Sequence, residues 1–154
     1  MSAISNTDIE IFYLMHRQRL RSAETRQLRH ILITINDAYA ENRRPRAQAR
    51  LSAIRQNLLQ EPQRFAAVAL QHSECPSALH GGLIGTLARG QLYAELDAVA
   101  FALQSGELSD ITESPMGLHL LRCEAIHPSR EISLAEAGPF IRRQLEQSRR
   151  RQAA

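Results

Sequence analysis

Two apolar runs with the character of β-strands, residues 28–35 and 117–125, constrain the fold of this 154-residue chain most strongly. The first reads Leu-Arg-His-Ile-Leu-Ile-Thr-Ile and ends at Asn36-Asp37, which is typical of a strand followed by a turn. Helical periodicity lies between and outside these runs, without regular strand–helix alternation. This order favours an α+β fold, a small antiparallel sheet surrounded by helices.

Amphipathic spacing of apolar residues predicts five helical segments around these runs. They are residues 8–26, residues 47–60, a segment that begins at Glu61-Pro62, residues 95–103, and residues 134–152 with an interruption at Gly138-Pro139. One more short strand is expected at residues 109–112. Residues 73–90 are rich in Ser, Pro and Gly, and we interpret them as a long loop of the kind that carries function.

Composition excludes several classes of protein. No apolar stretch approaches the roughly 18–20 residues of a membrane span, and the N-terminal residues lack the order of a signal peptide. We therefore expect a cytoplasmic protein without a membrane partner. The two cysteines, Cys75 and Cys123, are too few for a disulfide scaffold. No Cys or His cluster has zinc-like spacing, so we expect no structural metal.

All 19 basic residues are arginines, which we interpret as coding bias rather than a phosphate-binding surface. They concentrate near residues 17–29, near residues 43–50 and near residues 142–151. We expect most of them to lie on solvated helix faces, with no nucleic-acid partner. Binding of single strands uses interleaved aromatic side chains, and aromatics make up only 5% of the chain.

The chain lacks the common catalytic motifs for serine hydrolases, phosphate-binding loops and zinc proteases. Cys75, in the sequence His-Ser-Glu-Cys-Pro-Ser, could pair with one of several histidines to form a thiol hydrolase, since an imidazole can activate a thiolate. The alternative is that Cys75 is a small buried side chain. His30 and His119 lie in apolar strands, where histidines are commonly satisfied parts of the core.

Several short motifs, in a fixed order along the chain, resemble those of the parvulin-type peptidyl-prolyl cis–trans isomerases. They are Arg29-His30-Ile31-Leu32-Ile33, His72-Ser73-Glu74-Cys75-Pro76-Ser77, Gly81-Gly82-Leu83-Ile84-Gly85, Arg89-Gly90-Gln91-Leu92, Phe101-Ala102-Leu103, Gly106-Glu107-Leu108-Ser109, and Ser114 to Leu121. Together they span residues 28–126, about a whole parvulin domain. The resemblance implies an FKBP-like fold and catalysis of rotation about Xaa-Pro bonds, with no cofactor.

The flanking segments narrow this resemblance. Residues 1–27 look like the last helix of the chaperone-type region of longer bacterial foldases, residues 28–127 form the isomerase domain, and residues 128–154 form an Arg-rich helix. This organisation most resembles nitrogen-fixation accessory parvulins of the NifM type, which implies a role in maturing the nitrogenase iron protein. Those relatives carry a larger N-terminal region, which predicts a fragment or a short form here. The terminal helices are expected to pack on each other or on a client.

Four polar residues carry over as the catalytic set: His30, Cys75, Ser114 and His119. Two histidines on adjacent strands can share a hydrogen bond and orient the serine and the thiol beside the reacting carbonyl. We expect electrostatic and structural roles, because rotation about an amide needs no covalent step.

The proline pocket carries over as Ile84, Leu92, Leu96 and Phe101. This pocket is aliphatic at two positions where many parvulins have Phe or Met, which predicts weaker affinity for proline. Core packing is the alternative interpretation of each residue, and for Phe101 it is the favoured one.

A basic cluster, Arg43, Arg44 and Arg46, follows the first strand, where phosphate-directed parvulins select an acidic or phosphorylated residue before proline. Three interpretations stay open: selection of a phosphorylated residue, selection of an acidic residue, and a solvated loop. The expected partners are proline-containing clients. The rival function is a non-catalytic chaperone built on the same fold.

Overall fold

The computed structural model describes residues 3–153. These divide into two compact units. One unit is Glu24–His127, and the other combines the described parts of residues 1–23 and 128–154. The first boundary predicted from the sequence follows residue 27, whereas the larger unit begins at Glu24 because the first strand begins at Thr25. The terminal segments, whose helices were expected to pack on each other or on a client, lie together in the smaller unit.

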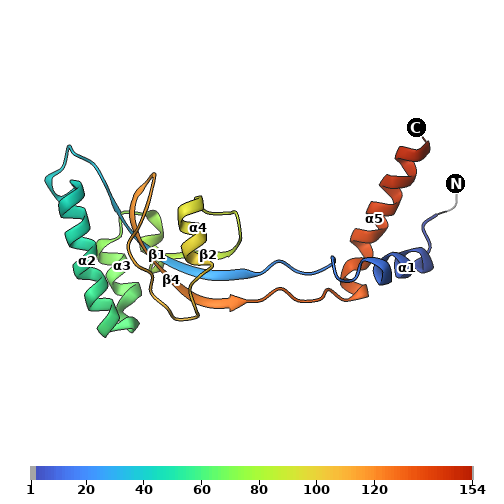
Figure 1. Cartoon of the computed structure of the whole chain (residues 1–154), viewed down its shortest axis with the longest axis horizontal. Coiled ribbons are helices and arrows are strands. Elements are labelled where there is room, and N and C mark those ends of the chain that lie inside the picture. Colours follow the sequence, from blue (N-terminus) through green and yellow to red (C-terminus); the bar gives the residue numbers. More distant parts are fainter. Residues whose placement is uncertain (1–2, 154) are drawn as a thin grey trace. The chain divides into compact units, whose positions relative to one another are not determined.

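A four-stranded antiparallel sheet forms the centre of the larger unit (Figure 1). Its strands are β1 (Thr25–Thr34), β2 (Leu83–Ala88), β3 (Thr112–Ser114) and β4 (Gly117–His127), in the order β2-β1-β4-β3. Strands β1 and β4 pair along their whole length, from Thr25 opposite His127 to Thr34 opposite Gly117. The predicted α+β fold is confirmed.

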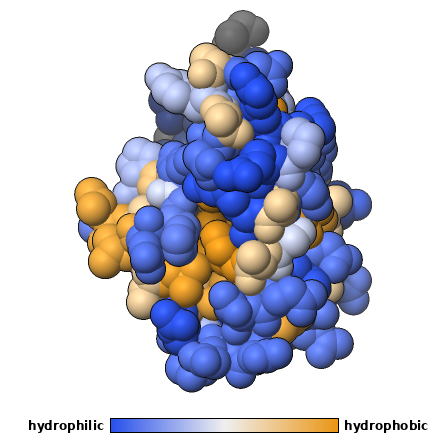
Figure 2. Space-filling view, turned by 90° about the vertical axis from the view of Figure 1, so that its left-hand side faces the viewer, coloured by the Kyte–Doolittle hydropathy of each residue, from blue (hydrophilic) through white to orange (hydrophobic). Residues whose placement is uncertain are grey.

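Helices cover both faces of the sheet. Helices α2 (Arg44–Gln60) and α3 (Phe65–His72) pack on one face, and α4 (Ala94–Ala100) contributes to the core on the other. Three short 3₁₀ helices, η1 (Ala40–Asn42), η2 (Pro62–Arg64) and η3 (Pro76–His80), complete the unit. Viewed from the side that carries α2, the surface shows a group of apolar side chains surrounded by polar ones (Figure 2).

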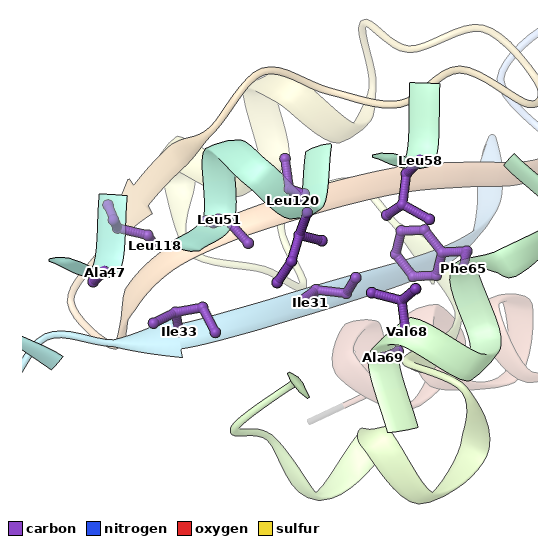
Figure 3. Close-up of a cluster of buried hydrophobic side chains, with 11 residues drawn as sticks. Ile31, Ile33, Ala47, Leu51, Leu58, Phe65, Val68, Ala69, Leu118 and Leu120 are labelled. Carbon is purple, nitrogen blue, oxygen red and sulfur yellow. The ribbon is translucent and has the colours of Figure 1, made fainter. Parts of the chain in front are cut away.

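Alternation along β1 and β4 divides the core in two, because successive side chains point to opposite faces of a strand. Ile31 and Ile33 point toward α2 and α3, where Leu51, Leu58 and Phe65 meet them (Figure 3). On the other face, Leu28, Leu121 and Cys123 pack against residues of α4 and the segment after it. His30 shares the parity of Leu28, so the predicted site histidine lies on the α4 face.

Several predicted elements differ from the structure. The first helix, α1 (Asn6–His16), ends well before residue 26, because the chain beyond it pairs in extended form, with Arg21 opposite Glu131. Residues 73–90 were expected to be a loop but contain η3 and strand β2. Strand β3 lies at residues 112–114 rather than 109–112.

The helix α5 (Leu134–Ala153) runs through Pro139 without the predicted interruption. A proline within a helix removes one backbone donor, and here the helix continues despite that loss. Ser133 supports its start, because the Glu136 amide donates to the Ser133 hydroxyl at 3.2 Å.

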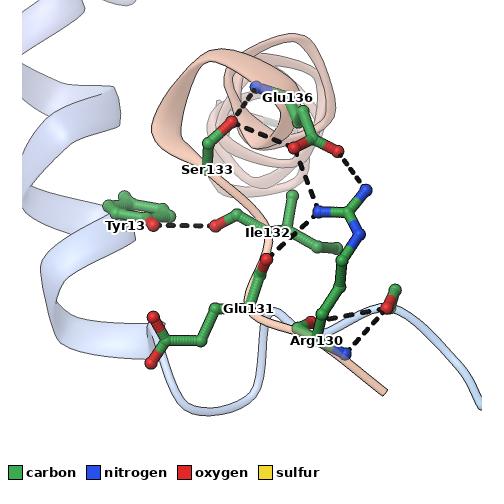
Figure 4. A network of polar contacts seen from close by, with 7 residues as sticks. Tyr13, Arg130, Glu131, Ile132, Ser133 and Glu136 are labelled. Carbon is green, nitrogen blue, oxygen red and sulfur yellow. Dashed lines mark hydrogen bonds and ion pairs between the residues drawn. The ribbon is translucent and has the colours of Figure 1, made fainter. Parts of the chain in front are cut away.

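The smaller unit is held by packing of α1 on α5. Its buried core is Ile4, Ile9, Tyr13, Ala137 and Ile141. The Tyr13 hydroxyl donates to the Ile132 carbonyl at 2.7 Å, and Arg130 binds both carboxylate oxygens of Glu136 (Figure 4). Across residues 3–153, none of the helices combines the length and the apolar character that crossing a bilayer requires.

Candidate active site

A cavity of about 770 Å³ opens on the α4 face of the larger unit. Its wall comes from β1, η3, β2, the start of α4 and β4, so it joins the regions that the sequence motifs singled out. Most of its lining is apolar, and three histidines, His30, His80 and His119, also line it. A second cavity of about 690 Å³ lies between α1 and α5, lined by helix residues that include no His or Cys.

Four side chains form a continuous hydrogen-bonded chain beside the cavity. The Ser77 hydroxyl lies 3.1 Å from His30 Nε2, and His30 Nδ1 lies 3.1 Å from His119 Nδ1. His119 Nε2 lies 2.6 Å from the Ser114 hydroxyl, which also accepts the Met116 amide at 3.1 Å. The two imidazole rings stack with centroids 5.3 Å apart. The predicted histidine pair and Ser114 are therefore brought together.

This chain can be satisfied in two opposite directions. In one, Ser77 donates to His30, His30 donates to His119, and His119 donates to Ser114. In the other, every donor becomes an acceptor. Each imidazole carries one proton in both directions, whereas protonating both rings would set two N–H donors against each other at the Nδ1 atoms. The geometry therefore excludes two charged rings and accommodates a neutral pair.

Burial of the two histidine side chains also favours their neutral forms. His30 is 6% exposed and His119 is fully buried. Desolvation lowers the pKa of His30 to about 4. The pKa of His119 is also lowered to about 4, first by desolvation and then by repulsion from His30. Both imidazoles are thus neutral near pH 7, and each ring can present one donor and one acceptor nitrogen.

Sheet register and two glycines place these groups. His30 faces Leu121 and Leu32 faces His119 across β1 and β4, so the two histidines are diagonal neighbours on one face. Gly82 has φ +81°, and a Cβ there would lie 2.4 Å from the His30 carbonyl oxygen. Gly117 has φ +144°, and a Cβ there would lie 2.5 Å from the Ile33 carbonyl oxygen. Side chains at either position would displace the strand that carries His30.

Cys75 lines the cavity but lies outside the hydrogen-bonded chain just described. It precedes η3, and its carbonyl accepts the Ala78 amide at 2.9 Å. Ser77 is the hydrogen-bond partner of His30 Nε2, a role that the sequence analysis assigned to no residue. The only signal for Ser77 was its position in the motif that contains Cys75, because spacing alone did not separate it from the neighbouring serines.

Three of the four predicted proline-pocket residues, Ile84, Leu92 and Leu96, line the cavity. Phe101 does not. It is 6% exposed and belongs to the buried cluster beneath α4. The cavity also has an apolar rim that the sequence did not predict, made of the exposed side chains of Leu79, Tyr93 and Met116.

The basic cluster is not part of the cavity wall. Arg43 donates to the Asp37 carbonyl at 3.4 Å. Arg44 pairs with Glu113 at 2.7 Å, and Arg46 pairs with Glu41 at 2.6 Å. Cys123 is buried in the core, and burial raises the pKa of its thiol. Within residues 3–153, no group of three or more His, Cys, Asp or Glu side chains is arranged to hold a metal ion.

The sheet, the surrounding helices and the histidine pair beside an apolar cavity define a domain of the parvulin class. Residues 30–125 match the Rotamase family model, described as the PPIC-type PPIase domain. The chain therefore belongs to the PPIC-type peptidyl-prolyl isomerase family, as the sequence motifs predicted.

Among curated proteins, the chain is 42% identical over 148 residues to NifM of Azotobacter chroococcum mcd 1, covering 96% of this chain and 50% of NifM. It is 40% identical over 76 residues to the peptidyl-prolyl cis–trans isomerase Pin1 of Digitalis lanata, covering 49% of this chain and 64% of that protein. The chain thus spans about half the length of the NifM proteins that it matches.

Solved structures agree on the fold. A structure from a study of the SurA-like chaperones PEB4 and Cj1289 of Campylobacter jejuni superposes with a TM-score of 0.67 at 18% identity. That match covers 97% of this chain and 57% of the other. A PpiC-type isomerase domain superposes with a TM-score of 0.59 at 26% identity, covering 72% of this chain and 95% of the domain.

Proposed function

We propose that this chain is a peptidyl-prolyl cis–trans isomerase that acts at the 770 Å³ cavity. The observation that carries the proposal is the neutral Ser77–His30–His119–Ser114 chain beside an apolar pocket. Rotation about an Xaa-Pro bond faces a barrier of about 18–20 kcal/mol and takes tens to hundreds of seconds unaided. A catalyst needs only to bind the twisted amide better than either planar form.

The apolar wall supplies the first part of that preference. Ile84, Leu92 and Leu96 hold the proline ring, and their surroundings exclude water from the bond. Planarity of an amide depends on charge separation, which water stabilises. Removing water therefore favours the twisted state, and each 1.4 kcal/mol or so of such preference gives about tenfold in rate.

The polar chain supplies the second part. Ser114 is 7% exposed and is not part of the cavity wall, whereas Cys75 lines it. We therefore propose that Cys75 faces the carbonyl group before proline, and that Ser114 orients the imidazoles through His119. None of these groups forms a covalent bond, because rotation neither makes nor breaks one. The proposal therefore assigns orientation and electrostatic roles to His30, Cys75, Ser114 and His119.

The basic cluster of Arg43, Arg44 and Arg46 is relevant to which residue the chain selects before proline. Selection of an acidic or phosphorylated residue there would require a substrate anion to displace Glu113 or Glu41 from the present ion pairs. The apolar rim formed by Leu79, Tyr93 and Met116 supports an uncharged residue instead. Peptides with Ala, Leu, Glu or phosphoserine before proline separate these alternatives by their ranking.

The client proposal follows from the NifM relatives. We propose that the chain assists maturation of the nitrogenase iron protein in the cytoplasm. Co-purification of the iron protein with the tagged chain from a nitrogen-fixing host is the expected result. Its absence under nitrogen-fixing conditions, in a soluble cytoplasmic fraction that contains both proteins, would contradict the client assignment while leaving the isomerase proposal in place.

A chaperone that binds proline-containing segments without catalysis is the second candidate, and the aliphatic pocket favours it because such a pocket holds proline more weakly. NMR exchange spectroscopy on short Xaa-Pro peptides decides between the two. Catalysed exchange that is lost in His119→Ala and Ser114→Ala supports the isomerase. Peptide binding without faster exchange supports the chaperone.

The Leu96→Phe variant adds a second discrimination, since it enlarges the apolar wall that contacts the ring. It raises turnover if weak proline binding limits an enzyme. If the chain is a chaperone without catalytic activity, the Leu96→Phe substitution changes only peptide binding.

A further inference from the structure

Arg26 is a buried arginine that connects strand β1 to the end of helix α4. Its residue is 8% exposed. Its Nη1 donates to the Ala100 carbonyl at 3.0 Å and to the Leu103 carbonyl. Its Nε and Nη2 both lie 3.2 Å from a carboxylate oxygen of Glu24. A charged group this deep is costly unless its donors are used. Here Nη1 binds carbonyls at and just beyond the end of α4, whereas Nε and Nη2 bind Glu24.

The same guanidinium lies over an aromatic ring in the core. Its central carbon is 5.3 Å from the centroid of Phe101, the residue after α4. Arg89 also lies over that ring, at 4.7 Å, and pairs with the second carboxylate oxygen of Glu24 at 3.5 Å. Glu24 therefore joins two arginines around Phe101. Cation–π contact of this kind strengthens when the cation is removed from water.

Helix α4 connects the contacts of Arg26 to the cavity. The helix has only seven residues, so a fixed last turn also fixes the first. Leu96, in its middle, lines the cavity and shares a buried cluster with Phe101. Tyr93, at its N-cap, lines the cavity as well. A cation bound to the last carbonyls also complements the negative end of the helix dipole.

We propose that Arg26 is a positioning residue for the proline pocket: it holds α4 so that Leu96 and the neighbouring apolar wall keep the shape that binds the ring. Arg26 does not line the cavity, so its effect is transmitted by α4. The inference rests on the proposed function, because it names what sets affinity at that site.

The chain offers a matched control in Arg122. This arginine lies over Phe65 at 4.6 Å, bonds the carboxylate of Glu124 at 2.7 Å and donates to the Pro62 carbonyl. Its side chain is 14% exposed, against 9% for Arg26. The contacts are of the same kind, but they hold the start of α3, a helix that contributes no residue to the cavity wall.

The experiment compares Arg26→Met with Arg122→Met. Both substitutions keep the alkyl chain and remove the charge and its hydrogen bonds, and both are expected to lower the thermal midpoint. Catalysed exchange measured at several peptide concentrations gives kcat and KM, and a separate NMR titration gives the peptide Kd. We expect Arg26→Met to raise KM and Kd by about tenfold, which corresponds to about 1.4 kcal/mol of lost binding free energy, with kcat nearly unchanged.

A conservative variant separates a positioning role of Arg26 from a general loss of rigidity in the domain. Arg26→Lys keeps a cation that can donate to the two carbonyls, so its KM and Kd should lie between those of the wild type and Arg26→Met. Glu24→Gln, a milder change, should raise KM in the same direction and serves if Arg26→Met does not fold. Unchanged KM and Kd in folded Arg26→Met, or an equal rise in Arg122→Met, overturns the proposal.

Failure of the proposed function gives a different result. A wild-type chain that binds the peptide without accelerating exchange contradicts the isomerase. The Kd comparison among the same variants still tests whether Arg26 positions the pocket.

Discussion

Acidification from pH 7 to pH 5 is expected to destabilise this domain through its two buried histidines. The folded-state pKa of each is about 4, against an ordinary value of 6.5. The unfolded chain therefore binds protons that the folded chain does not. Stability is fully present above about pH 6.5, falls as the pH drops toward 4, and loses nothing further from these groups below that pH.

The expected size follows from these values. Between pH 7 and pH 5 each histidine removes about 2 kcal/mol of unfolding free energy, and the pair removes about 4 kcal/mol. Domains have only about 5–15 kcal/mol in total, so the loss is a large share. This interval lies above the ordinary pKa values of carboxyl groups, which limits their contribution.

Urea unfolding followed by circular dichroism at pH 7, 6 and 5 measures the effect. His30→Gln and His119→Gln should each reduce the loss between pH 7 and 5 by about 2 kcal/mol, whatever their stability at pH 7. His127→Gln, at an exposed position, is the control and should leave the loss unchanged. A wild-type loss below about 1 kcal/mol, or the same loss in all three variants, would refute the conclusion that desolvation keeps the pair neutral.

Three further outcomes are expected. Gly82→Ala should cost at least about 2 kcal/mol more than Gly90→Ala in urea unfolding, because both glycines have positive φ but only at Gly82 would a Cβ meet backbone within 4 Å; equal costs would contradict a steric role. Ser114→Ala should lower stability by about 1–3 kcal/mol and reduce catalysed exchange, since it removes partners of His119 and the Met116 amide, whereas equal activity of the variant and the wild type would count against it. Cys75→Ala should keep catalysed exchange within about tenfold, because loss of a nucleophile costs on the order of a thousandfold or more, and such a loss would restore a covalent role.

The sequence predicted the fold class because its two long strands carry an unambiguous apolar pattern. Strand β2 escaped prediction because its residues, Leu83–Ala88, are only partly buried and follow two glycines. It is a strand because the Gly81-Gly82 turn returns the chain along β1, where the His30 amide donates to the Gly82 carbonyl at 2.9 Å. Pairing with β1, rather than the local β-propensity of its residues, therefore makes this segment a strand.

Side-chain direction explains the mixed result at the site. The histidine pair could be predicted because strand parity puts His30 and His119 on one face once the strands pair. For Phe101 the sequence favoured core packing over the pocket, and the structure agrees, because the residue after α4 turns into the buried cluster. Ser77 depends on the path of η3, and the motif that contains it does not state which of its polar side chains turns toward His30.

The division into two units also separates the charge of the chain. The terminal unit carries nine arginines and five acidic residues, whereas residues 24–127 carry ten arginines and eleven acidic residues. The positive net charge of the whole chain thus belongs to the terminal unit, and the unit with the cavity is close to neutral. Ionic strength should therefore have little effect on the binding of short uncharged peptides at the cavity, while it weakens any association that an acidic protein makes through the helical unit.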